Sequence, residues 1–184
     1  MKKKDMEHRD MEDSMDTHQY LTFSLGDETF AIEITHVREV TDYTEITKVP
    51  RMPDYLKGVM NLRGNVVSVV DLRLKMGMEA SGRSADTCIV IAEVFMEEER
   101  MPVGIITDAV QEVIRFLPRQ ISPAPRVGMK LNTEYIEGVG KRKDDFIIIL
   151  NIDKIISDTG QLKGGGGQES GGGNSSDADS ERNG

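Results

Sequence analysis

The stretch Gly58-Val-Met-Asn-Leu-Arg-Gly-Asn-Val-Val-Ser-Val-Val-Asp-Leu72 decides the fold of this chain, because it has the pattern of a β-hairpin. An apolar run comes first, and a strand of mainly β-branched residues follows over residues 66–70. Between them Arg63-Gly64-Asn65 forms the turn, and its last two residues tolerate the positive φ that tight turns need. The hairpin therefore holds Arg63 at its tip, either as a rigid fork for a partner or as a solvated turn residue.

A second hairpin precedes this one. Leu21, Phe23 and Leu25 alternate with polar residues, Gly26-Asp27 is a two-residue turn signal, and the alternation resumes at Phe30. Strands of this length, separated by frequent turn signals and little helix, are typical of small antiparallel barrels.

The second half of the chain repeats this order of elements. At an offset of 80 residues, Tyr55-Leu-Lys-Gly-Val59 matches Tyr135-Ile-Glu-Gly-Val139, and residues 66–70 match residues 146–150. At an offset of 73, Val37-Arg-Glu-Val40 matches Val110-Gln-Glu-Val113. We interpret this as an internal duplication that produces two barrels.

The duplication predicts how the barrels are arranged. We expect the first over residues 20–80 and the second over residues 81–157, with an exchange of terminal strands left open. The runs 66–70 and 146–150 are nearly continuous in apolar residues, so we expect them to be buried on both faces in a core that the barrels share.

Composition separates the folded part, 20–157, from both ends. Residues 1–19 are polar and charged, and half of the eighteen glycines lie from Gly160 onward. Such segments bury too little apolar surface to offset the entropy of ordering them. We therefore expect a disordered leader over 1–19 and a disordered Gly-rich tail over 158–184.

Charge and cysteine content narrow the class of protein. The 184 residues carry a formal net charge of -9 and no basic stripe, which argues against a nucleic-acid partner and against an anionic membrane surface. No apolar run approaches the length of a bilayer span, so we expect no direct membrane insertion. Cys88 is the single cysteine and cannot form an internal disulfide, which indicates a cytoplasmic protein.

The sequence contains no recognisable catalytic or metal-binding arrangement. His36 is the one histidine of the folded part, and Cys88 has no basic or histidine neighbour in the sequence. Asp71 precedes a helical pattern and is expected to cap it. We therefore expect no enzyme, no metal and no cofactor.

Four motifs, in order along the chain, point to a known family. They are Tyr20-Leu-Thr-Phe-Ser-Leu-Gly-Asp-Glu-Thr-Phe30, Gly58-Val-Met-Asn-Leu-Arg-Gly64 with the following Val-Val-Asp-Leu72, Val103-Gly-Ile-Ile-Thr-Asp108 and Tyr135-Ile-Glu-Gly-Val-Gly140. From about Tyr20 to Ile156 the chain resembles the CheW family of chemotaxis coupling proteins. The loop around residues 96–101 looks longer than is usual in that family.

The resemblance implies a mostly β fold of two SH3-like five-stranded barrels with a few short helices and without catalytic activity. It also implies an adaptor that links the cytoplasmic tip of methyl-accepting chemoreceptors to the regulatory domain of the histidine kinase CheA, at membrane receptor arrays. The matched positions make Val37, Glu39, Gly58 and Arg63 candidates for receptor binding. The kinase face is expected on the second barrel, near Cys88.

Structural interpretations of these residues stand beside the functional ones. Val37 suits a barrel core, and Glu39 suits a solvated surface. A CheW-like regulatory module of another two-component protein, such as a kinase regulatory domain or a CheV-type protein, is the alternative function. A small-molecule-binding barrel or enzyme is a third, and it would need a polar, partly enclosed pocket.

Overall fold

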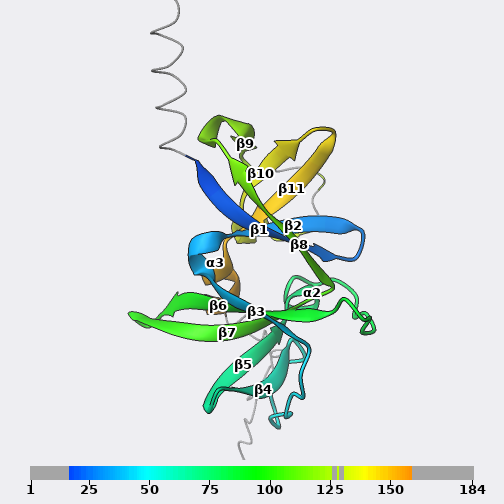
Figure 1. Cartoon of the computed structure of the whole chain (residues 1–184), viewed down its shortest axis with the longest axis vertical. Helices are drawn as coiled ribbons and strands as arrows, with labels where there is room; N and C mark the ends of the chain where they lie inside the picture. Colours follow the sequence, from blue (N-terminus) through cyan, green and yellow to red (C-terminus); the bar gives the residue numbers. More distant parts are fainter. Residues whose placement is uncertain (1–16, 126–127, 129–130, 159–184) are drawn as a thin grey trace, which may run out of the picture.

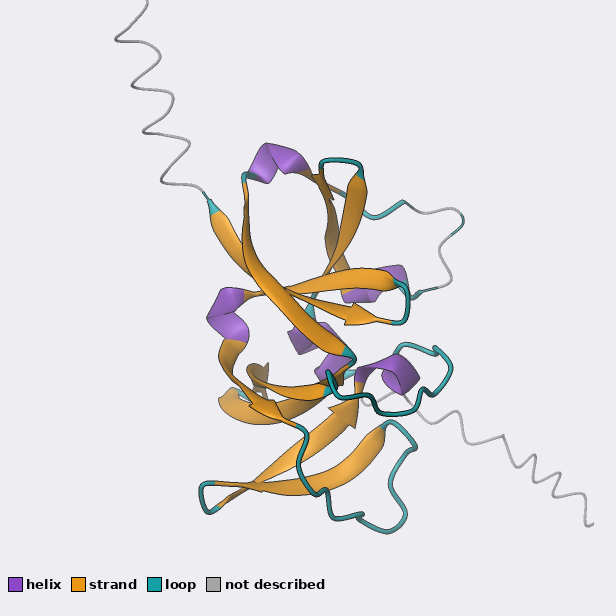
Figure 2. Cartoon of the chain, turned by 45° about the vertical axis from the view of Figure 1, so that its right-hand side comes forward, coloured by secondary structure: helices purple, strands orange, loops and turns teal. Residues whose placement is uncertain are grey.

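Nearly all regular structure is β-strand, divided between two sheets that pack on each other (Figures 1 and 2). The computed structural model describes residues 17–125, 128 and 131–158. Of the expected leader 1–19 and tail 158–184, residues 1–16 and 159–184 lie outside the described residues, whereas His18 and Gln19 already belong to β1. The expectation of a mostly β fold in two similar units with a few short helices is confirmed.

The two sheets are named here by their place in the chain. The terminal sheet has the order β8-β1-β2-β11-β10-β9 and consists of β1 (His18–Leu25), β2 (Glu28–Glu33), β8 (Ala109–Phe116), β9 (Ile121–Ser122), β10 (Ile136–Arg142) and β11 (Asp145–Leu150). The central sheet has the order β3-β6-β7-β5-β4 and consists of β3 (Val37–Asp42), β4 (Leu56–Leu62), β5 (Asn65–Asp71), β6 (Cys88–Met96) and β7 (Glu99–Thr107).

Among the described residues, four short helices lie between these strands and a fifth follows the last one. They are η1 (Ile34–His36), α2 (Leu72–Lys75), η2 (Pro118–Gln120), η3 (Thr133–Tyr135) and α3 (Ile152–Ser157). In Figure 1 the terminal sheet lies above the central sheet, and α3 lies between them.

The sheets do not follow the predicted division at residue 80. β1 and β2 pair with β8 and β11 from the second half of the chain, whereas the central sheet is one continuous stretch from β3 to β7. The barrels thus exchange their first strands, which the sequence left open. Alternation identifies a strand but not its partner, so the pattern alone could not assign β1 and β2 to the terminal sheet.

The internal duplication is visible in the strand register. Val69 of β5 lies parallel beside Gly104 of β7, and Ile149 of β11 lies parallel beside Ala31 of β2. These pairs are related by the offsets of 80 and 73 residues found in the sequence. They also correct the expectation of wholly antiparallel barrels: the chain from β5 to β7 passes through α2 and β6, and this crossover allows parallel pairing.

Both copies continue into a short capped helix. The side chain of Asp71 accepts a hydrogen bond from the backbone N–H of Leu74 at the start of α2. The side chain of Asn151 accepts one from the backbone N–H of Lys154 at the start of α3. The predicted cap at Asp71 is therefore confirmed, and its equivalent 80 residues later caps α3 in the same way.

Each sheet is closed by the segment that follows its first edge strand. After β3, Thr47 forms an antiparallel bridge with Val59 of β4, with both N–H···O distances at 2.9 Å. After β8, Ser122 of β9 pairs in the same way with Val139 of β10. Because these contacts join the two ends of a strand order, they turn each open sheet into a barrel.

The barrels share a core, as predicted. Phe23 and Phe30 of the terminal sheet and Val90 and Ile105 of the central sheet belong to one buried cluster. Smaller clusters fill each barrel separately. Burial of the runs 66–70 and 146–150 is only partly correct, because Val66 and Phe146 are 75% and 64% exposed. Each is close to a hairpin tip, and Ser68 of the first run is exposed as well, whereas Val67, Val69 and Val70 are buried.

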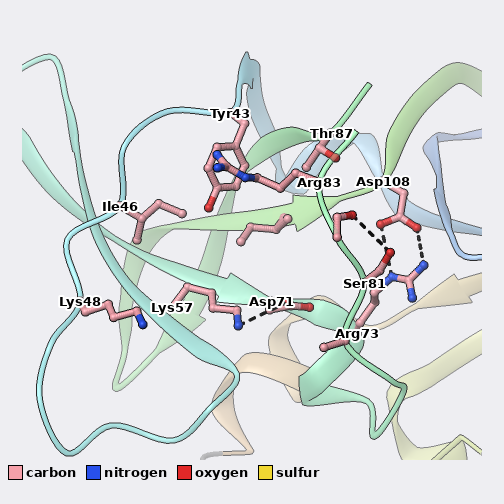
Figure 3. A pocket seen from close by; sticks show the side chains of 13 residues that line it. Tyr43, Ile46, Lys48, Lys57, Asp71, Arg73, Ser81, Arg83, Thr87 and Asp108 are labelled. Atoms are coloured by element: carbon pink, nitrogen blue, oxygen red, sulfur yellow. Dashed lines mark hydrogen bonds and ion pairs between the residues drawn. The ribbon is translucent and has the colours of Figure 1, made fainter. Parts of the chain in front are cut away.

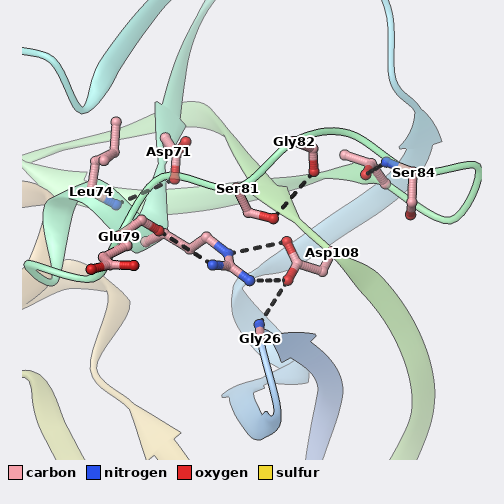
Figure 4. A network of polar contacts seen from close by, with 10 residues as sticks. Gly26, Asp71, Leu74, Glu79, Ser81, Gly82, Ser84 and Asp108 are labelled. Atoms are coloured by element: carbon pink, nitrogen blue, oxygen red, sulfur yellow. Dashed lines mark hydrogen bonds and ion pairs between the residues drawn. The ribbon is translucent and has the colours of Figure 1, made fainter.

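Asp108 ties the two barrels together where β7 passes into β8 (Figure 4). Its carboxylate accepts a bidentate pair of hydrogen bonds from Arg73 of α2 and one from the N–H of Gly26, at 2.7 Å, in the turn between β1 and β2. Burial alone would raise the pKa of Asp108, but the hydrogen bonds from Arg73 and Gly26 and the charge of Arg73 outweigh it and lower that pKa.

The lowered pKa predicts a pH-dependent contribution to stability. The carboxylate of Asp108 stabilises the fold above its ordinary pKa of about 3.9, and this contribution is lost as the pH falls through the lower, folded value. We expect Asp108→Asn to reduce the free energy of unfolding by about 1–2 kcal/mol at pH 7 and pH 5. The difference from wild type should shrink below pH 4.

Urea unfolding at pH 7, 5 and 3 measures this difference. Asp144→Asn is the matched control, because Asp144 is an exposed residue of the turn between β10 and β11. It should follow wild type at each pH. A difference for Asp108→Asn that is the same at pH 3 and pH 7 would contradict the assignment.

Candidate functional site

The hairpin of β4 and β5 carries Arg63 at its tip, as the sequence predicts. The turn is tighter than expected: Arg63 and Gly64 alone form the loop, with φ of +52° and +87°, and Asn65 already belongs to β5. Two successive positive φ values are the pattern of a type I′ turn, whose twist matches the strands. The side chain of Asn61 accepts a hydrogen bond of 2.7 Å from the N–H of Gly64 and holds the loop.

Arg63 forms a bidentate ion pair with Glu39. Its Nη1 donates to Oε2 at 2.7 Å and its Nη2 donates to Oε1 at 3.1 Å. Glu39 lies on β3 and Arg63 lies next to β4, so the pair joins the two edge strands of the central sheet. The Glu39 side chain is 23% exposed, whereas that of Arg63 is 73% exposed. The carboxylate therefore fixes a guanidinium that stays accessible.

The other two candidate receptor contacts lie deeper. Val37 is two residues before Glu39 on β3, half-buried, and packs against the shared core. Gly58 is buried in β4 with φ of +139°. A Cβ at this position would lie 2.0 Å from the carbonyl oxygen of Thr47. The backbone of Thr47 therefore occupies the space that the absence of a side chain at Gly58 leaves open.

Cys88 lies in a different place from the one predicted. It begins β6 in the central sheet, the same barrel as Glu39 and Arg63. It pairs with Asp42 at the far end of β3 from Val37. The thiol is half-buried and shares a hydrogen bond of 3.3 Å with the hydroxyl of Thr107. Because β6 follows β3 into the central sheet, a position after residue 80 does not place it on the other barrel.

The terminal sheet has an equivalent of the Glu39–Arg63 pair. Glu112 of β8 accepts two hydrogen bonds from Arg142 at the end of β10, and these hydrogen bonds lower the pKa of Glu112. Glu112 corresponds to Glu39 at the offset of 73 residues. The exposed Phe146 corresponds to the exposed Val66 at the offset of 80.

Sequence reasoning did not select this second pair, although a signal was present. The matched segments Val37-Arg-Glu-Val40 and Val110-Gln-Glu-Val113 already align Glu112 with Glu39. Arg142, in contrast, lies one residue away from the position equivalent to Arg63. Only the structure shows that its side chain reaches Glu112.

Two features are absent from the part of the chain that the structure describes. Across residues 17–125, 128 and 131–158, no group of three or more His, Cys, Asp or Glu side chains is arranged to hold a metal ion. Among these same residues, no helix has the length and apolar character needed to cross a membrane.

Comparison with known proteins agrees with this doubled geometry. The family model described as the CheW-like domain matches residues 19–160. The chain belongs to the CheW family. The match spans both barrels together, so the two sheets and their exchanged strands correspond to one CheW-like domain.

Relatives and a solved structure support the same assignment. The chemotaxis protein CheW of Klebsiella aerogenes is 34% identical over 139 residues, which cover 76% of this chain and 81% of the relative. The chemotaxis protein CheW of Helicobacter pylori is 33% identical over 145 residues, covering 79% and 85%. The crystal structure of the scaffolding protein TtCheW from Thermoanaerobacter tengcongensis aligns with a TM-score of 0.68 and 35% identity, covering 75% of this chain and 86% of that one.

The alternative of a CheW-like module in a larger protein is not favoured. The chemotaxis protein CheV3 of Helicobacter pylori is 23% identical over 131 residues, but these are only 41% of that relative. The relatives named CheW described above are matched over most of their length.

Proposed function

We propose that this chain is a non-catalytic chemotaxis coupling protein that joins the cytoplasmic tip of chemoreceptors to the regulatory domain of a CheA-type histidine kinase. In this role it works in the cytoplasm, is recruited to receptor arrays at the membrane, and lets the receptor state control kinase autophosphorylation. The names of its relatives supply the process, chemotaxis, and the similar crystal structure is that of a scaffolding protein.

The observation that supports the proposal most is that each barrel presents an arginine held by a glutamate of the same barrel. Glu39 holds Arg63 on the central sheet, and Glu112 holds Arg142 on the terminal sheet. An adaptor needs two separate binding surfaces on one folded unit. Here each barrel carries one of the surfaces, and the two barrels share a core. A barrel that binds a small molecule needs only one enclosed site.

The receptor surface in this proposal is the one around Arg63. Its guanidinium would donate to carboxylate or carbonyl groups at the tip of a helical hairpin, and Glu39 fixes its direction. Val37 would add apolar contact from the same strand. Gly58 contributes indirectly, by allowing the Thr47 segment to close the barrel that carries this surface.

The kinase surface is proposed at two places. Cys88 stays a proposed kinase contact, at the end of the central sheet away from Val37. The structure adds a second candidate around Glu112 and Arg142, on the other barrel. The exposed aromatic ring of Phe146, near the start of the strand after the Arg142 hairpin, would supply apolar contact area there.

Reconstitution tests the proposal. The chain should bind a receptor signalling fragment and a CheA-type kinase separately, and kinase autophosphorylation should rise when all three are present. Omitting the chain should remove that rise. Binding to neither partner, or an unchanged kinase activity on its addition, would exclude a coupling role.

A further inference from the structure

A cavity of about 390 Å³ opens at the end of the central barrel formed by the loops after β3 and α2 (Figure 3). Its walls come from the segment 43–48, which follows β3, and the segment 80–87, which precedes β6. Ile46 and Ile106 supply apolar lining. None of the proposed docking residues lines this cavity, although Cys88 directly follows Thr87 of its wall. The surfaces around Arg63 and Arg142 are separate from it.

Cations dominate the cavity, although the chain as a whole is acidic. Its charged lining consists of Lys48, Lys57, Arg73, Arg83, Asp71 and Asp108. Arg73 is paired with Asp108 and also donates a hydrogen bond to the carbonyl oxygen of Glu79. Lys57 lies 4.0 Å from Asp71. Two of the four cations, Arg73 and Lys57, are therefore already paired with a carboxylate of the cavity.

Lys48 and Arg83 are not neutralised in this way. Within residues 17–125, 128 and 131–158, neither forms an ion pair with a carboxylate. Arg83 instead lies over the ring of Tyr43, with 4.4 Å between the guanidinium carbon and the ring centroid, which fixes its direction. The cavity is thus complementary to a ligand that carries at least two negative charges.

The end of the described chain lies close to this cavity. Lys75 of α2 donates a hydrogen bond to the backbone carbonyl of Asp158, and the hydroxyl of Tyr135 donates to the Asp158 carboxylate. Arg73, which lines the cavity, belongs to the same short helix as Lys75. Asp158, the last described residue, therefore lies beside α2.

The chain beyond Asp158 carries the matching charges. Asp177, Asp179 and Glu181 lie within five residues, followed by Arg182. An extended chain covers up to about 3.3–3.6 Å per residue, so the residues from Asp158 to Asp177 are long enough to return to the cavity. A flexible tether keeps the local concentration of the segment that it carries in the millimolar range.

We propose that the acidic segment 177–181 of this chain docks in the cavity and pairs its carboxylates with Lys48 and Arg83. The docked segment covers the loops 43–48 and 80–87, which flank Cys88, and leaves the surfaces around Arg63 and Arg142 free. The cavity is thus a binding site for an acidic peptide, and this peptide belongs to the same chain.

Paramagnetic relaxation measures the docking directly. A nitroxide is attached at Ala178→Cys in a Cys88→Ser background of the full chain. We expect the amide signals of residues 44–48 and 81–87 to lose at least half of their intensity relative to the reduced label. Salt at 1 M, where the Debye length is about 3 Å, should restore them.

Charge reversal provides the decisive comparison. Lys48→Glu with Arg83→Glu should abolish the loss of intensity, whereas Lys141→Glu with Lys143→Glu, an equal change on the exposed β10–β11 hairpin, should leave it intact. Mixing labelled chain with isotope-enriched, label-free chain should give no effect. No intensity loss in the wild-type background, equal loss in both charge variants, or transfer of the effect to the label-free chain would overturn docking in cis.

Discussion

Replacing Gly58 by alanine is expected to lower the free energy of unfolding by about 3–5 kcal/mol. The new Cβ would stand 2.0 Å from the Thr47 carbonyl oxygen, and φ of +139° is strained for any side chain. Relief requires the Thr47 segment to move away, which breaks both hydrogen bonds to Val59 and opens the central barrel. Urea unfolding followed by circular dichroism measures the change.

Two other glycines separate the causes of this loss. In Gly64→Ala the new Cβ has no neighbour within 4 Å, but φ stays at +87°. Backbone strain alone should therefore lower the free energy of unfolding by about 1–2 kcal/mol. Gly82→Ala meets open space without a positive φ and should stay within about 0.5 kcal/mol of wild type. A Gly58 variant no less stable than the Gly64 variant would contradict the barrel closure.

This result bears on how receptor-binding data should be interpreted. A Gly58 variant that fails to bind receptor would fail because the barrel has opened, not because a contact was removed. Arg63, in contrast, lies on an exposed tip and can be changed without altering the core.

Arg63→Glu is expected to weaken binding to a receptor fragment by about 10- to 100-fold, because it removes the guanidinium fork and places two carboxylates together. The same variant should retain kinase binding, and its stability should stay within about 1 kcal/mol of wild type. Titration of each partner by calorimetry, with a parallel unfolding curve, separates these effects. A folded Arg63→Glu variant with wild-type receptor affinity would remove this residue from the proposed site.

The matched control is Arg142→Glu on the terminal barrel. It breaks the equivalent pair with Glu112 and changes the charge equally. We expect it to reduce kinase binding and to leave receptor binding unchanged. The exchange Glu39→Arg with Arg63→Glu keeps an ion pair across the barrel edge but moves the positive charge to β3. It should restore stability without restoring receptor affinity.

The strands and their duplication could be predicted because they depend on local patterns. Alternation and turn residues identify the hairpin of β4 and β5, and the constant offsets locate its copy in β10 and β11. Even the equivalent irregularities fall at matched positions: the register shifts just before Gly58 and just before Gly138.

The assignment of strands to barrels could not be predicted in the same way. β2 passes through η1 directly into β3, yet the two strands belong to different sheets. Nothing in the alternation of Phe30 and Ile32 distinguishes β11 from another neighbour. The partner is decided by packing across the shared core, where residues distant in sequence meet.

The candidate site, too, could be predicted only in part, because contacts between distant segments are not visible in the sequence. The Asn-Leu-Arg-Gly turn located Arg63, but contact with Glu39 depends on closure between β3 and β4. The sequence suggests that Gly58 makes space for a receptor, whereas the structure fills that space with Thr47. A glycine in a strand indicates a close approach, and only the folded chain shows what approaches.

Recruitment of kinase to receptor-bearing vesicles tests the central claim most directly. Vesicles with receptor fragments, kinase and this chain are sedimented, and the kinase in the pellet is measured. We expect kinase in the pellet with wild type, and little with either Arg63→Glu or Arg142→Glu, because each variant releases one partner. Equal amounts of pelleted kinase with and without the chain would show that it does not bridge the two.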